Sequence, residues 1–188
     1  MRKLSVFNNV TIDGYFTGAN GDFSWAHSGP PDPEFDAFVA GNAESNGELL
    51  FGRVTYQLMA AFWPTPAAAQ MNPVVAAGMN SMPKIVFSST LERAEWHNTR
   101  VIRGGLATAV RQMKSEIGPD LVILGSGTLV AQLAQESLID EYQLVVNPIA
   151  IGSGRTMFDG LSSPRQLKLA STRAFASGKL FNCYEPSR

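Results

Sequence analysis

The chain has 188 residues, of which 45% are apolar and 16% charged, and its 15 Lys and Arg against 16 Asp and Glu leave a formal charge of -1. A chain of this length and apolar content can bury the core of a single α/β domain, which excludes disordered, collagen-like and coiled-coil proteins. It has no basic run to neutralise phosphates, so nucleic acid is not an expected partner. The charged fraction lies below the usual ~25%, which hints at a homodimer whose second copy covers part of the surface.

Cysteine and histidine are scarce in the sequence. Cys183 is the single cysteine, so no internal disulfide forms, and together with His27 and His97 it cannot supply a structural zinc site. We therefore expect no metal. The apolar stretch at residues 4–7 is too short for a signal peptide, and no apolar run approaches the ~18 residues of a membrane span. These features predict a cytoplasmic protein with no membrane partner.

The predicted elements alternate between strand and helix along most of the chain. In chain order, apolar periodicity and breaker residues predict a strand at residues 3–10, a helix at 33–42, a strand at 48–51, helices at 54–62 and 67–80, strands at 84–87 and 100–102, a helix at 106–117, a strand at 121–124, a helix at 128–136, and strands at 141–147, 166–174 and 179–184.

Two segments define the fold class. In the helix at residues 106–117, Leu106, Val110, Met113 and Ile117 follow one another at spacings of four, three and four, so they share one face. The last two strands flank a short turn that ends in Gly178, which is typical of an antiparallel hairpin. Residues 1–188 therefore predict one three-layer α/β/α domain, with a mostly parallel sheet of about eight strands and an antiparallel C-terminal hairpin.

Ligands of such a sheet bind beyond the carboxyl ends of its strands, where helix N-termini present unpaired N–H groups. Three of the predicted strand ends carry suitable residues. Phosphate contacts are expected from Gly52, Arg53 and Thr55 after one strand, a pyrophosphate cradle from Gly125, Ser126 and Gly127 after another, and ribose contacts from Ser88 and Ser89 after a third.

Each of these turns alone is compatible with an ordinary tight turn. Three in one sheet favour an elongated ligand with phosphates in its middle and at one end, and NADPH is the natural candidate. A Rossmann dehydrogenase is the obvious alternative, but its glycine fingerprint follows the first strand, whereas Gly125 precedes only the closing strands. Gly152 and Gly154 precede no helix, so we interpret that segment as a loop beside the pocket.

Several short motifs resemble the dihydrofolate reductase fold family over most of the chain. Residues 11–14 (TIDG) are similar to its SLDG element, and residues 50–56 (LFGRVTY) to its GR-x-TY element. Further matches are residues 83–88, 124–127 and 138–141, with Pro148, Gly152, Gly154 and Phe158. The combination most closely resembles the reductase domain of the bifunctional riboflavin-biosynthesis deaminase/reductase and its stand-alone relatives.

The resemblance implies NADPH-dependent hydride transfer and assigns residues to the cofactor. Arg53 and Thr55 would hold its phosphates, and Ser88 and Ser89 its adenosine end. The backbone at Val10 would face the nicotinamide, together with Thr17 and Gly18. The pyrophosphate is assigned to Gly125, Ser126, Gly127, Thr128 and Leu129.

On the substrate side, the resemblance points to the predicted helix at residues 33–42. Asp36 is the candidate catalytic residue, because a buried carboxylate with a raised pKa can orient a substrate and assist protonation next to the hydride acceptor. Asp36 could instead simply suit the dipole of the first helical turn. Trp25 and Phe35 could wall a flat heterocycle, or belong to the core.

Two departures limit the resemblance. Residues 80–83 (NSMP) lack the arginine that holds the folate tail, and the glycine pair of true folate reductases reads Gly125-Ser126 here. In addition, no Lys/Arg cluster remains for the ribose phosphate of a riboflavin precursor. The expected function is reduction of a C=N or C=O bond in a small pterin- or pyrimidine-like substrate. The alternative is a catalytically silent nucleotide-binding or regulatory module of the same fold.

Overall fold

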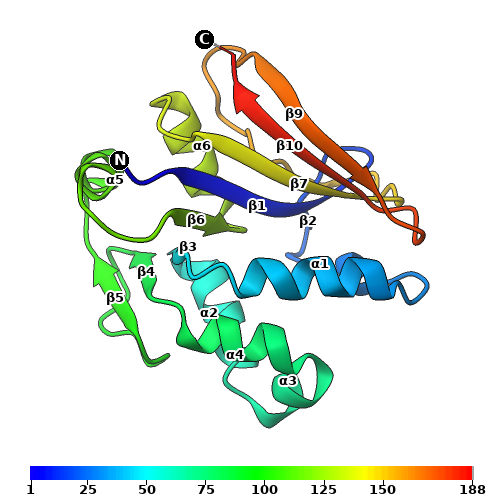
Figure 1. Ribbon diagram of the computed structural model, residues 1–188. Helices are drawn as coiled ribbons and strands as arrows, with labels where there is room; N and C mark the ends of the chain where they lie inside the picture. The colour runs from blue at the N-terminus through cyan, green and yellow to red at the C-terminus, as the bar shows by residue number, and fades with distance from the viewer. Residues whose placement is uncertain (188) are drawn as a thin grey trace.

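The computed structural model describes residues 1–187 and builds them around one eight-stranded sheet (Figure 1). The strands lie in the order β5-β4-β3-β6-β1-β7-β10-β9, and all neighbours up to β7 are parallel. β10 is antiparallel to both β7 and β9, which confirms the predicted hairpin at the edge. The strands are β1 (Leu4–Thr11), β3 (Glu48–Gly52), β4 (Lys84–Phe87), β5 (Thr99–Ile102), β6 (Leu121–Leu124), β7 (Glu141–Asn147), β9 (Leu167–Ala174) and β10 (Leu180–Pro186).

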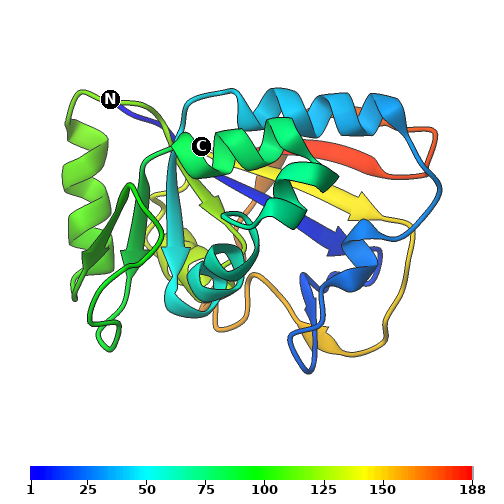
Figure 2. The same ribbon diagram turned by 90° about the horizontal axis from the view of Figure 1, so that it is seen from below.

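Helices cover both faces of the sheet, as the views in Figure 1 and Figure 2 show together. Strand side chains alternate between two apolar clusters, since successive residues point to opposite faces. One cluster joins β1 to α5 and α6, and the other joins β3 to α2 and α4. The helices are α1 (Pro33–Ala43), α2 (Arg53–Phe62), α3 (Pro66–Met71), α4 (Pro73–Ser81), α5 (Leu106–Ser115) and α6 (Gly127–Gln135), with a 3-10 turn at Ser24–His27.

The helix predicted at residues 67–80 is wrong as a single element. It is divided into α3 and α4 at Asn72, whose side-chain oxygen accepts a hydrogen bond from Val75 N at 3.3 Å and so caps α4. Pro73 occupies the first turn of α4. A proline disfavours helical backbone in the residue before it, and asparagine is a preferred cap, so the Asn-Pro pair ends one helix and begins the next.

The predicted helix at residues 106–117 is two residues too long. α5 ends at Ser115, and Glu116 has extended backbone. Ile117 is therefore fully exposed instead of continuing the apolar face of Val110 and Met113. The following Gly118 and Pro119 favour an end to the helix, which comes two residues earlier than the spacing of apolar residues indicates.

A second, two-stranded sheet was not predicted. β2 (Thr17–Gly18) pairs antiparallel with β8 (Gly154–Arg155), and Phe16 N also donates to Arg155 O at 3.0 Å. A side chain at Gly154 would collide with the carbonyl oxygen of Thr17, so only glycine allows this close approach. The segment around Gly154, interpreted from sequence as a loop, therefore anchors residues 16–18 beside the main sheet.

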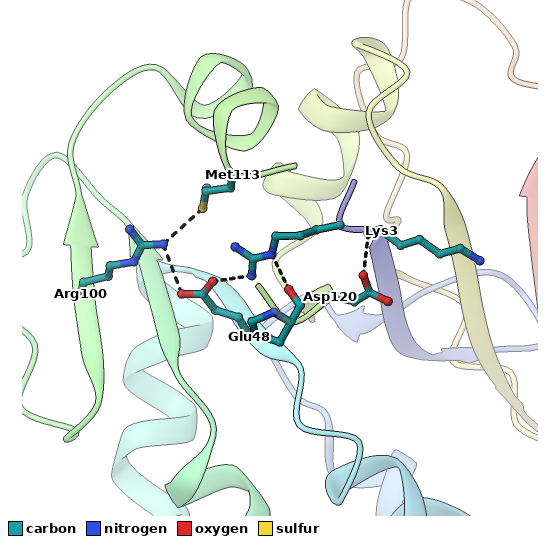
Figure 3. Close-up of polar contacts among 7 residues, drawn as sticks. Lys3, Glu48, Arg100, Met113 and Asp120 are labelled. Atoms are coloured by element: carbon teal, nitrogen blue, oxygen red, sulfur yellow. Dashed lines mark hydrogen bonds and ion pairs between the residues drawn. The ribbon is translucent and has the colours of Figure 1, made fainter. Parts of the chain in front are cut away.

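Charged residues join the amino ends of the strands, at the edge opposite to the helix N-termini (Figure 3). Glu48 at the start of β3 is buried and accepts from Arg2 Nη2 at 2.6 Å and Arg100 Nη2 at 3.2 Å. Asp120 accepts from Lys3 N at 2.7 Å. These contacts tie β1, β3, β5 and the segment before β6 together at one end of the sheet.

Candidate functional site

A large cleft runs from the carboxyl ends of the parallel strands along α1 and α2 to the segments before β3 and β6, where Gly47 and Asp120 line it. Its volume is about 2140 Å³. Clefts for one drug-sized ligand usually measure ~300–1,000 Å³. The cleft therefore has room for more than one small molecule.

Three helices begin at this cleft. α2 follows β3 directly at Gly52, α6 follows β6 after Gly125 and Ser126, and α5 follows β5 after Gly104 and Gly105. All three junctions line the cleft. The first N–H groups of a helix lack helical partners and carry a partial positive charge, so anionic groups are favoured here.

Ser126 joins two of the junctions. Its Oγ accepts a hydrogen bond from Gly52 N at 2.8 Å, and its own N–H donates to Thr55 Oγ1 at 3.1 Å. Ser126 is buried and has left-handed backbone with φ of 53°. The two hydroxyl oxygens, expected from sequence to contact phosphates, therefore hold the β3–α2 and β6–α6 junctions together.

The β6–α6 turn is supported from β1. The buried side chain of Asn8 accepts from Gly125 N at 2.6 Å and donates to Gly125 O at 3.4 Å. A Cβ at Gly127 would lie 2.6 Å from the tip of the Phe16 ring, so a larger residue here would require Phe16 to move. Asn8 was missed in the sequence analysis, although two consecutive asparagines inside an otherwise mostly apolar strand were a usable signal.

Most of the residues predicted to bind a cofactor come together in this one cleft. The residues that line it are Thr17, Gly52, Arg53, Thr55, Ser88, Ser89, Gly125, Ser126, Gly127, Thr128 and Leu129. The lining does not include Val10, whose side chain lies in the core with α6 and whose carbonyl oxygen accepts from Asn147 Nδ2 at 3.3 Å. Gly18 is also outside it, in the β2–β8 pair.

The polar side chains near the start of α2 differ in their exposure and in whether they already bond to other protein groups. Arg53 is exposed in the first turn of α2, and its guanidinium donates to Gln57 Oε1 at 2.9 Å. Ser88 Oγ accepts from Leu91 N at 2.9 Å, so it also shapes its own loop, whereas Ser89 is exposed. Arg155 of β8 also lines the cleft and was missed, because no local pattern marks it.

The other half of the cleft lies against α1. Phe35 and Asp36 line it, but Asp36 is exposed, so the burial that the sequence-based argument required of this carboxylate is wrong. Asp32 is the buried carboxylate, at 5% exposure, and it caps α1 by accepting from Phe35 N at 3.1 Å. Ser177 N also donates to it at 2.8 Å, and these N–H groups hold the pKa of Asp32 below its usual range.

Trp25 does not wall the cleft. It is 6% exposed and lies outside the lining, with its ring edge-on to Phe23, which does line the cleft, at 5.6 Å between ring centroids. The 3-10 turn buries the tryptophan and leaves the neighbouring His27 at the cleft. Burial and, secondarily, the charge of Lys179 lower the pKa of His27.

Lys179 is the main residue of this half that sequence reasoning missed. It is 6% exposed and lines the cleft, although it lies far from α1 in the sequence, in the C-terminal hairpin directly before β10. Its ammonium group donates to Ala26 O at 2.9 Å and to Asn147 Oδ1 at 2.8 Å. Burial lowers its pKa, against the opposing charges of Asp36 and Asp32. In the sequence, Lys179 simply follows the turn residue Gly178, and nothing in that pattern indicates that the lysine is buried beside a cleft.

An apolar wall completes the cleft. Val54, Leu58 and Phe62 are spaced by four residues, so they share one face of α2, and all three are partly exposed and line the cleft. A flat, largely apolar ligand would cover this face.

No three His, Cys, Asp or Glu side chains in the described part of the chain are grouped to hold a metal ion. Among the helices at residues 1–187, none combines the length and apolar character of a bilayer span.

The sequence matches the family model of the RibD C-terminal domain over residues 2–181. It is 27% identical to YyaP of Bacillus subtilis over 177 residues, which cover 94% of this chain and 91% of YyaP. YwjB of the same organism is 24% identical over 176 residues, with 93% and 92% covered.

Two solved structures share the fold. A "Putative riboflavin biosynthesis protein" of Shewanella sp. PV-4 superimposes with a TM-score of 0.75 at 21% identity, covering 99% of both chains. Dihydrofolate reductase of Enterococcus faecalis, complexed with NADP(H), superimposes with a TM-score of 0.67 at 14% identity, covering 99% of this chain and 97% of the other. With the three-layer architecture and the match along nearly its whole length, this chain belongs to the RibD C-terminal domain family and has the dihydrofolate reductase fold.

Proposed function

We propose that this protein is a single-domain, NADPH-dependent reductase that transfers hydride to a C=N or C=O bond of a small heterocycle of the pterin or pyrimidine type. The observation that carries the proposal is the continuity of the cleft. Arg53, Ser88 and Gly125 open onto the same space as Phe35 and Asp36, so a phosphate-bearing cofactor and a second ligand can lie next to each other. Membership of a family whose members include reductases supports it.

The residues present fit an extended dinucleotide. Three helix N-termini line one half of the cleft, and an exposed arginine, Arg53, lies at one of them. Arg53 would bind the phosphate next to the adenosine, with Ser88 and Ser89 beside it, and the backbone of residues 125–129 would bind the pyrophosphate. Thr17, and the backbone at Val10 and Gly18, would lie nearest the nicotinamide. NADPH supplies a hydride when bound.

The chain's own part in the reaction is positioning. Phe35 of α1 and Leu58 of α2 provide apolar surfaces that would orient a flat ring and exclude water from it. Asp36 is the proposed group that, as a carboxylate, accepts a hydrogen bond from a ring N–H and so orients the substrate for protonation next to the hydride acceptor. Asp36 is exposed, so the bound substrate itself would have to shield this contact from water.

Cofactor titration tests the phosphate assignment. We expect Arg53→Ala to weaken NADPH binding by about tenfold, because one charge-assisted contact to the extra phosphate is lost, and to leave NADH binding nearly unchanged. Binding is measured by nucleotide fluorescence. Arg93→Ala is the matched control, because Arg93 is exposed and pairs only with Glu95. Equal losses for NADPH and NADH would reject the assigned role, and absence of binding of either would reject the function.

A silent nucleotide-binding module is the second candidate, and the exposure of Asp36 favours it. A silent module would bind NADPH without oxidising it. Absorbance at 340 nm with a panel of pterins, pyrimidines and quinones separates the two. Oxidation that is faster than in Asp36→Asn supports the reductase and the role of Asp36, whereas tight NADPH binding without turnover of any compound supports the module.

A further inference from the structure

The ammonium group of Lys179 has more hydrogen-bonding capacity than its protein neighbours use. An ammonium group carries three donors and no acceptor. Two donors are used by Ala26 O and Asn147 Oδ1. The third has no hydrogen-bond partner within residues 1–187, although the side chain is more than nine-tenths buried and borders the cleft.

The positive charge of Lys179 is also not neutralised by an ion pair in the described part of the chain. Asp32 lies close enough to attract it, but the oxygens of Asp32 are engaged by the N–H groups of Phe35 and Ser177. Asp36 also attracts it, and His27, on the 3-10 turn, lies near it. The ring of Phe35, 5.0 Å from Nζ, covers one side of the ammonium group. A buried cation placed in this way is stabilised by an acceptor that arrives with a ligand.

The neighbouring amides determine what else faces the cleft here. Lys179 can only donate, so the Asn147 atom bound to it is an oxygen, and the amide nitrogen of Asn147 must donate. Asn147 Nδ2 donates to Asn9 Oδ1 at 3.1 Å, and also to two backbone carbonyl oxygens. Asn9 lines the cleft, and its own Nδ2 has no partner among the described residues. Lys179 and Asn9 thus offer two donors on one side of the cleft.

We propose that Lys179 and Asn9 form a recognition edge for a carbonyl or enolate oxygen of the substrate, so that the protein selects lactam heterocycles, in which C=O adjoins N–H. The carboxylate of Asp36, on the opposing helix α1, is complementary, because it can accept from the N–H of the same lactam. This inference rests on the proposed function, since it assigns substrate groups to the half of the cleft beyond the cofactor.

A purely structural role for Lys179 predicts something different. Its bonds to Ala26 and Asn147 connect the 3-10 turn to β7, so a tether alone would affect folding and every ligand alike. Recognition of an oxygen affects only ligands that carry one. Two probes of similar size separate these roles: lumazine, a pteridine with two ring carbonyl groups, and quinoxaline, a bicyclic heterocycle without carbonyl groups.

The experiment measures the affinity of both probes for the protein saturated with NADPH. We expect Lys179→Met to weaken lumazine at least about tenfold, the effect of losing a hydrogen bond to a charged group, with no change for quinoxaline. Asn9→Ala, which leaves Asn147 Nδ2 two carbonyl acceptors and so preserves the fold, should weaken lumazine less. Lys179→Arg should restore part of the affinity. Lys3→Met is the control, because Lys3 is exposed and its hydrogen bonds are made by its backbone.

The outcomes are distinct. Lumazine binding that is unchanged in both variants, or that weakens in parallel with quinoxaline, overturns the proposal, as does a wild-type protein that binds quinoxaline but not lumazine. NADPH affinity is measured without probes in each variant. Loss of NADPH binding in Lys179→Met alone would show a structural role, and absence of NADPH binding by the wild type would instead refute the proposed function.

Discussion

Lys84, at the amino end of β4, is the most completely buried charged side chain, at 1% exposure. Its ammonium group donates to Asn80 O at 3.1 Å and Met82 O at 2.7 Å, and lies 4.4 Å from the centre of the Trp96 ring. Burial lowers the pKa of Lys84 from 10.5 to about 8. The unfolded chain therefore binds more protons than the folded protein between these pH values, and stability should rise with pH across this window.

The prediction for Lys84 compares the free energy of unfolding of the wild type with that of Lys84→Met, so that other titrating groups cancel. Burial raises the pKa of Cys183 from 9.0 to about 11, which lowers stability as pH rises above 9 in wild type and variant alike. The free energy of unfolding of wild type minus that of Lys84→Met should increase from pH 8 to 10.5, by at most ~3 kcal/mol. Urea unfolding at several pH values measures it, with Lys3→Met as the exposed control. A difference that is constant with pH would contradict the assignment.

Among elements, the cluster around Glu48 has the clearest energetic consequence. Glu48→Ala leaves the 5% exposed side chain of Arg2 without its carboxylate partner, and it also releases Arg100 of β5. Removing one partner of a buried pair costs ~3–5 kcal/mol. We expect a loss of this order in urea unfolding, without a change in NADPH affinity, because none of Arg2, Glu48 and Arg100 lines the cleft.

Glu95 supplies the matched control for Glu48. It pairs with Arg93, and both side chains are at least 80% exposed, so Glu95→Ala should change stability by less than ~1 kcal/mol. Equal free energies of unfolding for Glu48→Ala and Glu95→Ala would show that the buried charges around Glu48 do not stabilise the fold. If Glu48→Ala also weakens NADPH binding at a temperature at which the variant is still folded, the two ends of the sheet are energetically coupled.

The elements themselves were largely predictable. The strands at residues 84–87, 121–124 and 141–147 agree with their predicted limits. Each contains at least three apolar residues, and the first two end at the local breakers Ser88 and Gly125. The β2–β8 pair was not predictable, since two-residue strands have no periodicity. Thr17 and Arg155 meet only because loops far apart in the sequence are brought together by the sheet.

For the whole molecule, the homodimer expected from the low charged fraction stays a prediction. β9 is one of the two edge strands, and unlike β5 at the other edge its residues from Lys168 to Ala174 are all exposed. Open edges of this kind are usually covered or blunted in stable proteins. We expect analytical ultracentrifugation to give twice the mass of one chain, and Leu169→Lys on this strand to shift the protein towards the monomer. A wild-type monomer at every concentration would contradict this prediction.

The sequence by itself determined the alternation of strands and helices and the glycine turns of the half of the cleft proposed to bind the cofactor, because these depend on neighbouring residues. Only the tertiary structure decided the half beside α1, which is proposed to bind the substrate. It buried Trp25, exposed Asp36 and brought Lys179 to Ala26, 153 positions away along the chain. The physical reason is that burial of a polar side chain depends on which distant segments pack over it, and here the C-terminal hairpin folds back over the start of α1.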